Sequence, residues 1–138
     1  MPVLPISIVD NEFITLQYLP DKKTIYHIIH KPIIDDQDFI VPLDAGTKAL
    51  KQYGVCKWLS DDRNNGPLSP TFLKWSETDW QPRTIASGWK YWANIVPSEL
   101  VAAGSLIPVI ESLHEMGLHM MVFSDFKKAV EWLDRQTG

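Results

Sequence analysis

The chain has 138 residues, of which 45% are hydrophobic and 22% are charged, and its formal net charge at pH 7 is -4. This length and composition are typical of one globular domain, spanning residues 1–138, with a single core. The acidic balance and the lack of any run of Lys or Arg argue against DNA or RNA as a partner.

Cysteine content and hydropathy indicate the compartment. Cys56 is the only cysteine, so no disulfide can form within the chain, and its apolar surroundings place it in the core. Residues 1–10 lack both a basic start and an apolar stretch long enough for export, and no window approaches a membrane span. We therefore expect a cytoplasmic protein that is not an integral membrane protein.

The first half of the chain predicts a hairpin followed by a helix. Alternating apolar residues over 13–19 and a β-rich run over 24–33 flank the turn-forming segment Pro20-Asp21-Lys22-Lys23. A helix is expected next, with Asp38 as its cap and Gly54 as its stop, because apolar residues between them recur at helical spacing.

In the second half, predicted strands alternate with predicted helices. The strands cover 55–60, 91–96 and 118–123. Helices are expected to begin at Ser69-Pro70, at Ser98 and at Ser124, with Ser69 and Ser124 as capping residues. Pro82 should kink or end the first of these helices before Gly88, and Gly104 should interrupt the second, which restarts at Ser105 and closes at Gly117.

This order predicts an α/β fold in one domain. The amino-terminal hairpin is followed by βαβαβα, and such alternation requires crossover connections and a largely parallel sheet. We expect a mixed five-stranded sheet flanked by about four helices. The exposed edge of the hairpin, in an acidic protein, makes a homodimer a candidate assembly.

A cluster of charged residues follows the strand over 55–60. Ser60, Asp61, Asp62 and Arg63 stand where strands of an open α/β sheet usually meet ligands and partners. In an extended segment Asp61 and Asp62 point to opposite faces, whereas a turn at Asp61 would bring them together. Arg63 is a ready ion-pair partner for either carboxylate. The cluster can be a solvated loop, a recognition surface, or a site of catalysis or metal binding.

Six tryptophans are a compositional excess, and four of them fall within residues 75–92 around Pro82. They can form a core between helix and sheet, or line an apolar pocket or a protein interface. Trp80, Arg83 and Trp89 are the first candidates for binding, because a kink at Pro82 loosens packing and Arg83 adds a polar contact.

The residue pattern contains no recognised catalytic motif. His27 and His30 are three apart on a predicted strand and face opposite sides, and no metal-ligand spacing such as His-Glu-x-x-His occurs. A Gly-x-Ser-x-Gly elbow and glycine-rich phosphate loops are also missing. We expect no catalytic residue, no metal and no cofactor.

Three segments resemble the bacterial SpoIIAA-like family, which belongs to the wider group of STAS and SEC14-like domains. They are Lys57-Trp58-Leu59-Ser60-Asp61-Asp62-Arg63, Trp89-Lys90-Tyr91-Trp92-Ala93, and Val122-Phe123-Ser124-Asp125 with the following Ala129-Val130-Glu131-Trp132-Leu133. The resemblance extends from about the second strand to the end of the chain. It implies a mixed sheet flanked by helices, in a group that includes anti-sigma factor antagonists and carriers of apolar ligands.

The resemblance also implies a regulatory serine. In the antagonists, a serine between a central strand and the next helix is phosphorylated to switch the binding of a partner kinase. The matching loop here carries Ser60 at its start and Ser69 at its end, which makes both candidate phosphorylation sites. The Asp-Ser-Ser/Ala-Gly pattern of the antagonists is not present in this loop.

Three hypotheses about function follow. The first is a non-enzymatic binding domain for regulatory protein–protein interaction, with residues 60–65 as its recognition edge. The second is a carrier or sensor of a lipid or other small apolar ligand, enclosed by Trp75, Trp80, Trp89 and the break at Gly104. The third is a metal-dependent hydrolase that uses Asp61 or Asp62.

Overall fold

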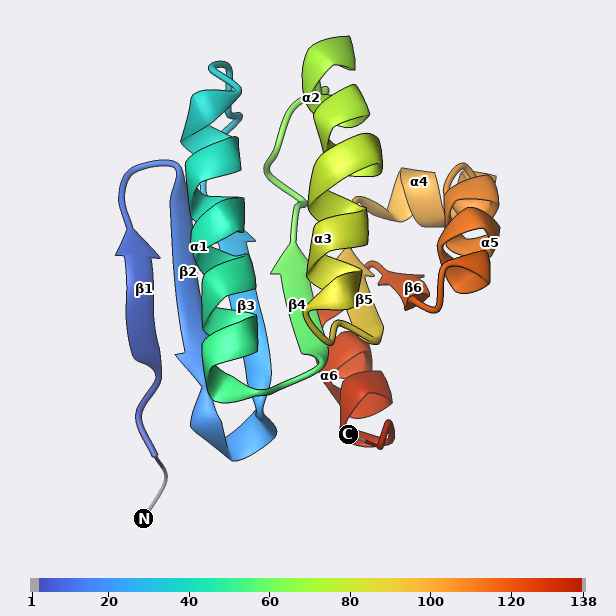
Figure 1. Ribbon diagram of the computed structural model, residues 1–138. Helices are drawn as coiled ribbons and strands as arrows, with labels where there is room; N and C mark the ends of the chain where they lie inside the picture. The colour runs from blue at the N-terminus through green and yellow to red at the C-terminus, as the bar shows by residue number, and fades with distance from the viewer. Residues whose placement is uncertain (1–2, 138) are drawn as a thin grey trace.

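The computed structural model describes residues 3–137, and a mixed six-stranded sheet in the order β1-β2-β3-β4-β5-β6 forms its centre (Figure 1). The strands are β1 (Ile6–Asp10), β2 (Ile14–Leu19), β3 (Thr24–Ile29), β4 (Lys57–Asp61), β5 (Tyr91–Ile95) and β6 (His119–Phe123). β1, β2 and β3 pair antiparallel, whereas β3 through β6 run parallel, as the alternation of strands and helices predicts.

Helices connect the parallel strands, and one more helix follows the last strand. They are α1 (Gln37–Tyr53), α2 (Pro70–Trp75), η2 (Ser76–Trp80), α3 (Gln81–Ala86), α4 (Ser98–Ala103), α5 (Ile107–Glu115) and α6 (Phe126–Asp134), with a short 3₁₀ turn, η1 (Pro20–Lys22), inside the hairpin. The segments α2, η2 and α3 follow one another without a break, so residues 3–137 form five helical bodies around the sheet. The α/β class is therefore confirmed.

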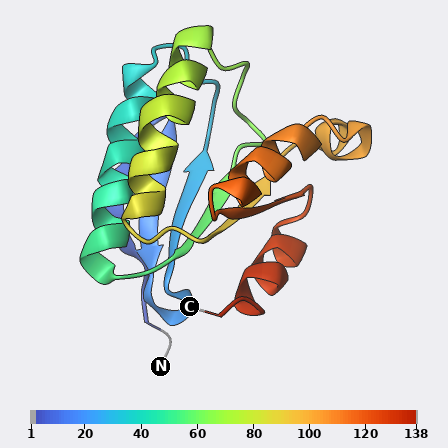
Figure 2. The same cartoon turned by 45° about the vertical axis from the view of Figure 1, so that its right-hand side comes forward.

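The sheet separates two hydrophobic clusters. Trp58 of β4 belongs to the larger cluster, which α1, the α2–α3 segment and α5 cover, whereas its neighbour Leu59 belongs to a smaller cluster beneath α6. Successive side chains of a strand point to opposite faces, so one strand serves both clusters. Figures 1 and 2 show α1 and the α2–α3 segment side by side over one face, with α6 behind the other.

The prediction of five strands was wrong, because β1 adds a sixth at the edge. β1 pairs with β2, but the register shifts between Ser7 and Val9, which pair with Gln17 and Leu16. The consecutive apolar residues Ile8 and Val9 lie at this bulge and break the strict alternation of apolar and polar residues that would have indicated a strand. The predicted second strand is also shorter than expected, since β3 ends at Ile29 rather than at residue 33.

Three predicted helix caps were displaced by one or two residues. The N-cap of α5 is Leu106 and not Ser105, and the other two lie at α1 and α6. Asp36 occupies the N-cap position of α1, and Asp38 lies inside the first turn. At α6 the cap is Asp125, whose carboxylate accepts a hydrogen bond from the Lys127 N–H over 3.1 Å, and not Ser124. The α2–α3 segment ends before Gly88, as predicted, and its irregularity is the π-helical turn η2, which ends two residues before Pro82.

Candidate functional site

The loop after β4 lies at the carboxyl ends of the parallel strands and is held by hydrogen bonds of its backbone and of the Asn65 side chain. Asp61 is the last residue of β4, and the Asp62 N–H donates to the Ile95 carbonyl at the end of β5 over 2.9 Å. The side-chain oxygen of Asn65 accepts from the N–H groups of Ile33 and Gly66 at 3.1 and 3.0 Å. These bonds tie the loop to both neighbouring strand ends, so it presents a fixed surface.

Asp61 and Arg63 form a forked ion pair at this rim. Arg63 Nε and Nη2 donate to the two carboxylate oxygens of Asp61 over 3.0 and 2.7 Å. Asp61 is buried, whereas the Arg63 side chain is 43% exposed. Hydrogen bonding to Asp61 raises the pKa of Arg63, so the guanidinium stays charged. Arg63 Nη1 takes no part in this pair and makes no hydrogen bond within residues 3–137, which leaves it for an external acceptor.

Tyr26 of β3 adjoins the same pair on the α6 side of the sheet. Burial, with a smaller contribution from the negative charge of Asp61, raises the pKa of Tyr26 to about 12, although Arg63 opposes the shift. Its ring lies 5.8 Å from that of Phe126 at the start of α6, measured between centroids. Tyr26 is therefore a neutral side chain beside the ion pair at physiological pH.

Asp62 points to the other side of the sheet, where it contacts a buried histidine. His27 Nε2 lies 2.8 Å from the Asp62 carboxylate, and His27 Nδ1 lies 3.0 Å from the Trp58 indole nitrogen. Because an indole N–H can only donate, Nδ1 is the acceptor and Nε2 carries the proton that Asp62 accepts. Asp61 and Asp62 thus lie on opposite faces, as the sequence indicates for an extended segment, and do not form a carboxylate pair.

The two candidate serines differ in their accessibility. Ser60 is completely buried, accepts a hydrogen bond from the Trp92 indole over 2.7 Å and donates to the Asn94 side chain over 3.0 Å. The folded chain therefore does not present Ser60 to a kinase, which argues against phosphorylation there. Ser69 is half-buried, caps α2 by accepting from the Phe72 N–H, and donates to the Asp36 carboxylate.

The tryptophans form a packed core. Trp80 and Trp89 are buried, and their ring centroids lie 5.1 Å apart. Trp58, Trp75 and Trp92 pack against these two rings with centroid distances between 5.1 and 6.4 Å. The Trp80 indole donates to Thr47 and the Trp89 indole to the Tyr91 carbonyl, so both polar groups are satisfied inside the protein. This placement supports the core interpretation and not a binding role for either ring.

Arg83 does not join the loop after β4. It binds Asp44 of α1 over 2.7 Å and Asp79 of η2 over 3.3 Å, and hydrogen bonding to Asp44 raises its pKa. Its side chain is 40% exposed. Arg83 therefore links α1 to the α2–α3 segment, whereas Arg63 pairs within its own loop.

A cavity of about 380 Å³, which sequence reasoning missed, adjoins the loop. Its lining residues are Pro32, Ile33, Ile34, Asp36, Phe39, Gly66, Pro67, Leu68, Ser69 and Phe72. Ile34 is 91% exposed and Leu68 is 40% exposed at its rim. The signal in the sequence was two apolar stretches that follow strands, Pro32-Ile33-Ile34 and Pro67-Leu68, in segments that form loops.

Within residues 3–137, no group of three or more His, Cys, Asp or Glu side chains is placed to hold a metal ion. The described part of the chain also has no helix with the length and hydropathy needed to cross a membrane. Comparison of the chain with protein-family models, with curated proteins and with solved structures found no match. The fold is that of an α/β protein with a mixed six-stranded sheet.

Proposed function

We propose that this chain is a non-enzymatic binding domain that recognises another protein at the carboxyl ends of β3 and β4. The observation that carries the proposal is the position of the forked Asp61–Arg63 pair beside an apolar cavity with exposed side chains at its rim. This role agrees with the regulatory binding that the SpoIIAA-like resemblance implies.

The cavity and the ion pair would make different contributions to such binding. Protein interfaces draw most of their affinity from apolar anchors that enter pockets, whereas charged groups at the rim select partners. An apolar side chain of the partner would enter the cavity beside Phe39 and Phe72, whose rings stack on each other with centroids 4.9 Å apart and form part of its lining. A carboxylate of the partner would then meet Arg63 Nη1.

The exposed Ile34 favours a protein partner over a small molecule. Its side chain is 91% exposed, and a small ligand inside the cavity would leave it in water. A protein surface laid across the rim would cover both Ile34 and Leu68, which removes more apolar surface from water. The occupant that accounts for all of these features is therefore a protein.

Site-specific photocrosslinking in cells of the source organism tests the proposal. A photoreactive residue at position 34 or 68 should capture one and the same partner, and a photoreactive residue at the exposed Lys51 of α1 should not. The double variant Asp61→Asn with Arg63→Gln removes both charges but keeps a neutral hydrogen-bonding pair, so it should fold and lose the adduct. Adducts that are equal at positions 34 and 51, or that survive the double variant, would contradict this recognition surface.

Ser69 is the serine at which a regulatory switch can operate in this proposal. Phosphorylation would place about two negative charges beside Asp36 and remove the O–H that Ser69 donates to this carboxylate. Both effects would open the wall of the cavity. Partner capture at position 68 should therefore fall in Ser69→Asp and remain in Ser69→Thr, which keeps a capping hydroxyl.

A small apolar ligand is the second candidate occupant, because a volume of about 380 Å³ lies within the usual range for ligand pockets. In this hypothesis the ligand binds in the cavity lined by Phe39 and Phe72, and not among the tryptophans, which pack against one another. Native mass spectrometry of the purified protein tests it. A bound molecule that disappears in Leu68→Trp supports the carrier, and an unliganded mass in the wild type removes it.

A further inference from the structure

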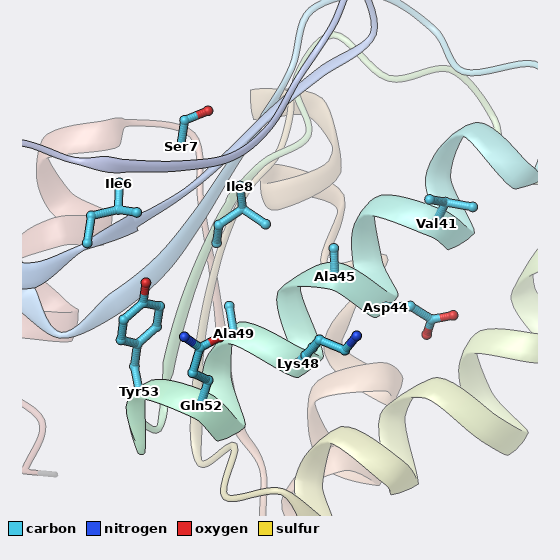
Figure 3. Close-up of a pocket in the computed structure, with 10 residues that line it drawn as sticks. All are labelled: Ile6, Ser7, Ile8, Val41, Asp44, Ala45, Lys48, Ala49, Gln52 and Tyr53. Carbon is cyan, nitrogen blue, oxygen red and sulfur yellow. The ribbon is translucent and has the colours of Figure 1, made fainter.

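A second cavity, of about 460 Å³, lies at the opposite edge of the sheet between β1 and α1 (Figure 3). Its lining residues are Ile6, Ser7, Ile8, Val41, Asp44, Ala45, Lys48, Ala49, Gln52 and Tyr53. Figure 3 shows Ile6 and Ile8 pointing from β1 toward α1, which forms the other wall. The groove is therefore a surface shared by an edge strand and a helix.

The outer edge of β1 has no strand beside it in the part of the chain that the structure describes, because β1 ends the strand order. Half of the backbone N–H and C=O groups of an edge strand point away from its neighbour. Large apolar side chains are also exposed here, since Val3, Leu4 and Ile6 are 56%, 79% and 42% exposed. An uncovered apolar edge of this kind is a template for pairing with another strand.

We propose that a second copy of this chain occupies this edge, with the two β1 strands paired antiparallel across a two-fold axis. Antiparallel pairing of a strand with itself is self-complementary, because each donor of one copy meets an acceptor of the other. The two sheets then form one continuous sheet. The exposed apolar residues Val3, Leu4 and Ile6 become buried at the seam.

The charges on α1 support a second copy as the occupant. Asp44 and Lys48 stand one helical turn apart on the groove wall, and Lys48 has no carboxylate partner among the described residues. A two-fold axis perpendicular to the paired strands makes the two α1 helices antiparallel. Lys48 of each copy then approaches the Asp44 carboxylate of the other, which Arg83 of the same chain already binds through Oδ1. Neutral Gln52 and apolar Val41 fill the remaining surface between the helices.

The contact needs both the strand and the helix. A stable interface buries roughly 800 Å² on each partner, about a tenth of the 7687 Å² surface of this chain. The bulge between Ser7 and Val9 keeps the regular part of β1 short, and bulges usually limit pairing at an edge. Strand pairing alone would therefore be weak. Merging of the two grooves beside α1 supplies the additional contact.

Sedimentation velocity over a range of concentrations tests the dimer. Wild-type protein should be mostly dimeric at about 100 µM, where a micromolar dissociation constant leaves most chains paired. Ile6→Asp places a charge at the seam and should give monomers. Ile107→Asp is the matched control, because Ile107 is an exposed apolar residue on α5 and should leave the dimer intact. Wild-type monomers at this concentration would overturn the proposal.

A charge exchange tests the two-fold arrangement itself. In an Arg83→Ala background, which frees Asp44 from its partner within the chain, Lys48→Glu should weaken the dimer by at least tenfold because like charges then meet. The addition of Asp44→Lys should restore it, since the charges are again complementary across the axis. Circular dichroism confirms that each variant is folded. A dimer that Lys48→Glu leaves unchanged, or that the double exchange fails to restore, would overturn the arrangement.

Discussion

The indole N–H of Trp58 donates a hydrogen bond to His27 Nδ1 over 3.0 Å, and this bond determines which nitrogen of the buried imidazole carries the proton. The N–H group at Nε2 then donates a hydrogen bond to the carboxylate of Asp62 at the rim of the sheet, over 2.8 Å. A core tryptophan thus orients an exposed loop through one histidine.

This relationship predicts the tautomer of His27. Long-range nitrogen–proton NMR spectra should show His27 protonated at Nε2 near neutral pH. Trp58→Phe removes the donor and leaves Nδ1 buried without a partner, which should destabilise the fold by about 1–3 kcal/mol in addition to the loss of ring contacts. Trp132→Phe, on the other face of the sheet, is the control and should leave the His27 signals unchanged. Protonation at Nδ1 in the wild type would contradict the prediction.

Gly46 of α1 permits the close approach of the helix to Trp58. A Cβ atom at this position would overlap the Trp58 ring. Gly46→Ala should therefore destabilise the protein by about 1–3 kcal/mol, although alanine is the better helix former by about 1 kcal/mol. Chemical denaturation measures the change. Gly46→Ala combined with Trp58→Phe should cost less than the sum of the two single variants, because the smaller ring leaves room for the methyl group.

The order of strands and helices from residue 13 onward was predictable because local signals agree there. Apolar periodicity, turn formers and capping residues all indicate the same elements. β1 was missed since its bulge disrupts the alternation, and the exact caps were missed since Asp36 and Asp38 carry the same chemistry. The packing of α1 on the sheet determines which of the two aspartates is the N-cap, and this packing cannot be inferred from the local sequence.

The site was predictable only where its contacts are local. Arg63 was expected to pair with a neighbouring aspartate, and the structure shows its pair with Asp61 two residues away. His27 reaches Asp62 from 35 residues away, and only the register of β3 against β4 brings them together. The burial of Ser60 had a local signal, because it lies two residues after Trp58 and therefore on the same face of the strand.

Ser60 should behave as a structural residue. Ser60→Ala leaves the Trp92 indole without its acceptor and should destabilise the fold by about 1–3 kcal/mol. Ser60→Asp buries a charge at a fully enclosed position and should be markedly worse. Ser69→Ala is the comparison, with an expected loss of about 1 kcal/mol from the α2 cap. Thermal unfolding that shows Ser60→Asp to be as stable as the wild type would show that the hydroxyl is accessible.

Alkaline titration should single out Tyr26. Its pKa is about 12 in the folded protein because burial and then Asp61 disfavour the phenolate, whereas an unfolded tyrosine ionises near pH 10. As pH rises from 10 to 12, the unfolded chain loses this proton and the folded chain keeps it, so the free energy of unfolding decreases. Tyr26→Phe should reduce this loss of stability and remove the tyrosinate absorbance that develops near pH 12.

Asp61→Asn separates the two causes of this shift. It removes the negative charge but leaves the burial of Tyr26 in place, so the pKa should fall toward 10 without reaching it, because burial is the larger cause. The absorbance step of Tyr26 should then move to lower pH. An unchanged step would mean that the charge of Asp61 does not affect the pKa of Tyr26. The Asp61–Arg63 ion pair would then be too far from Tyr26 to influence its ionisation.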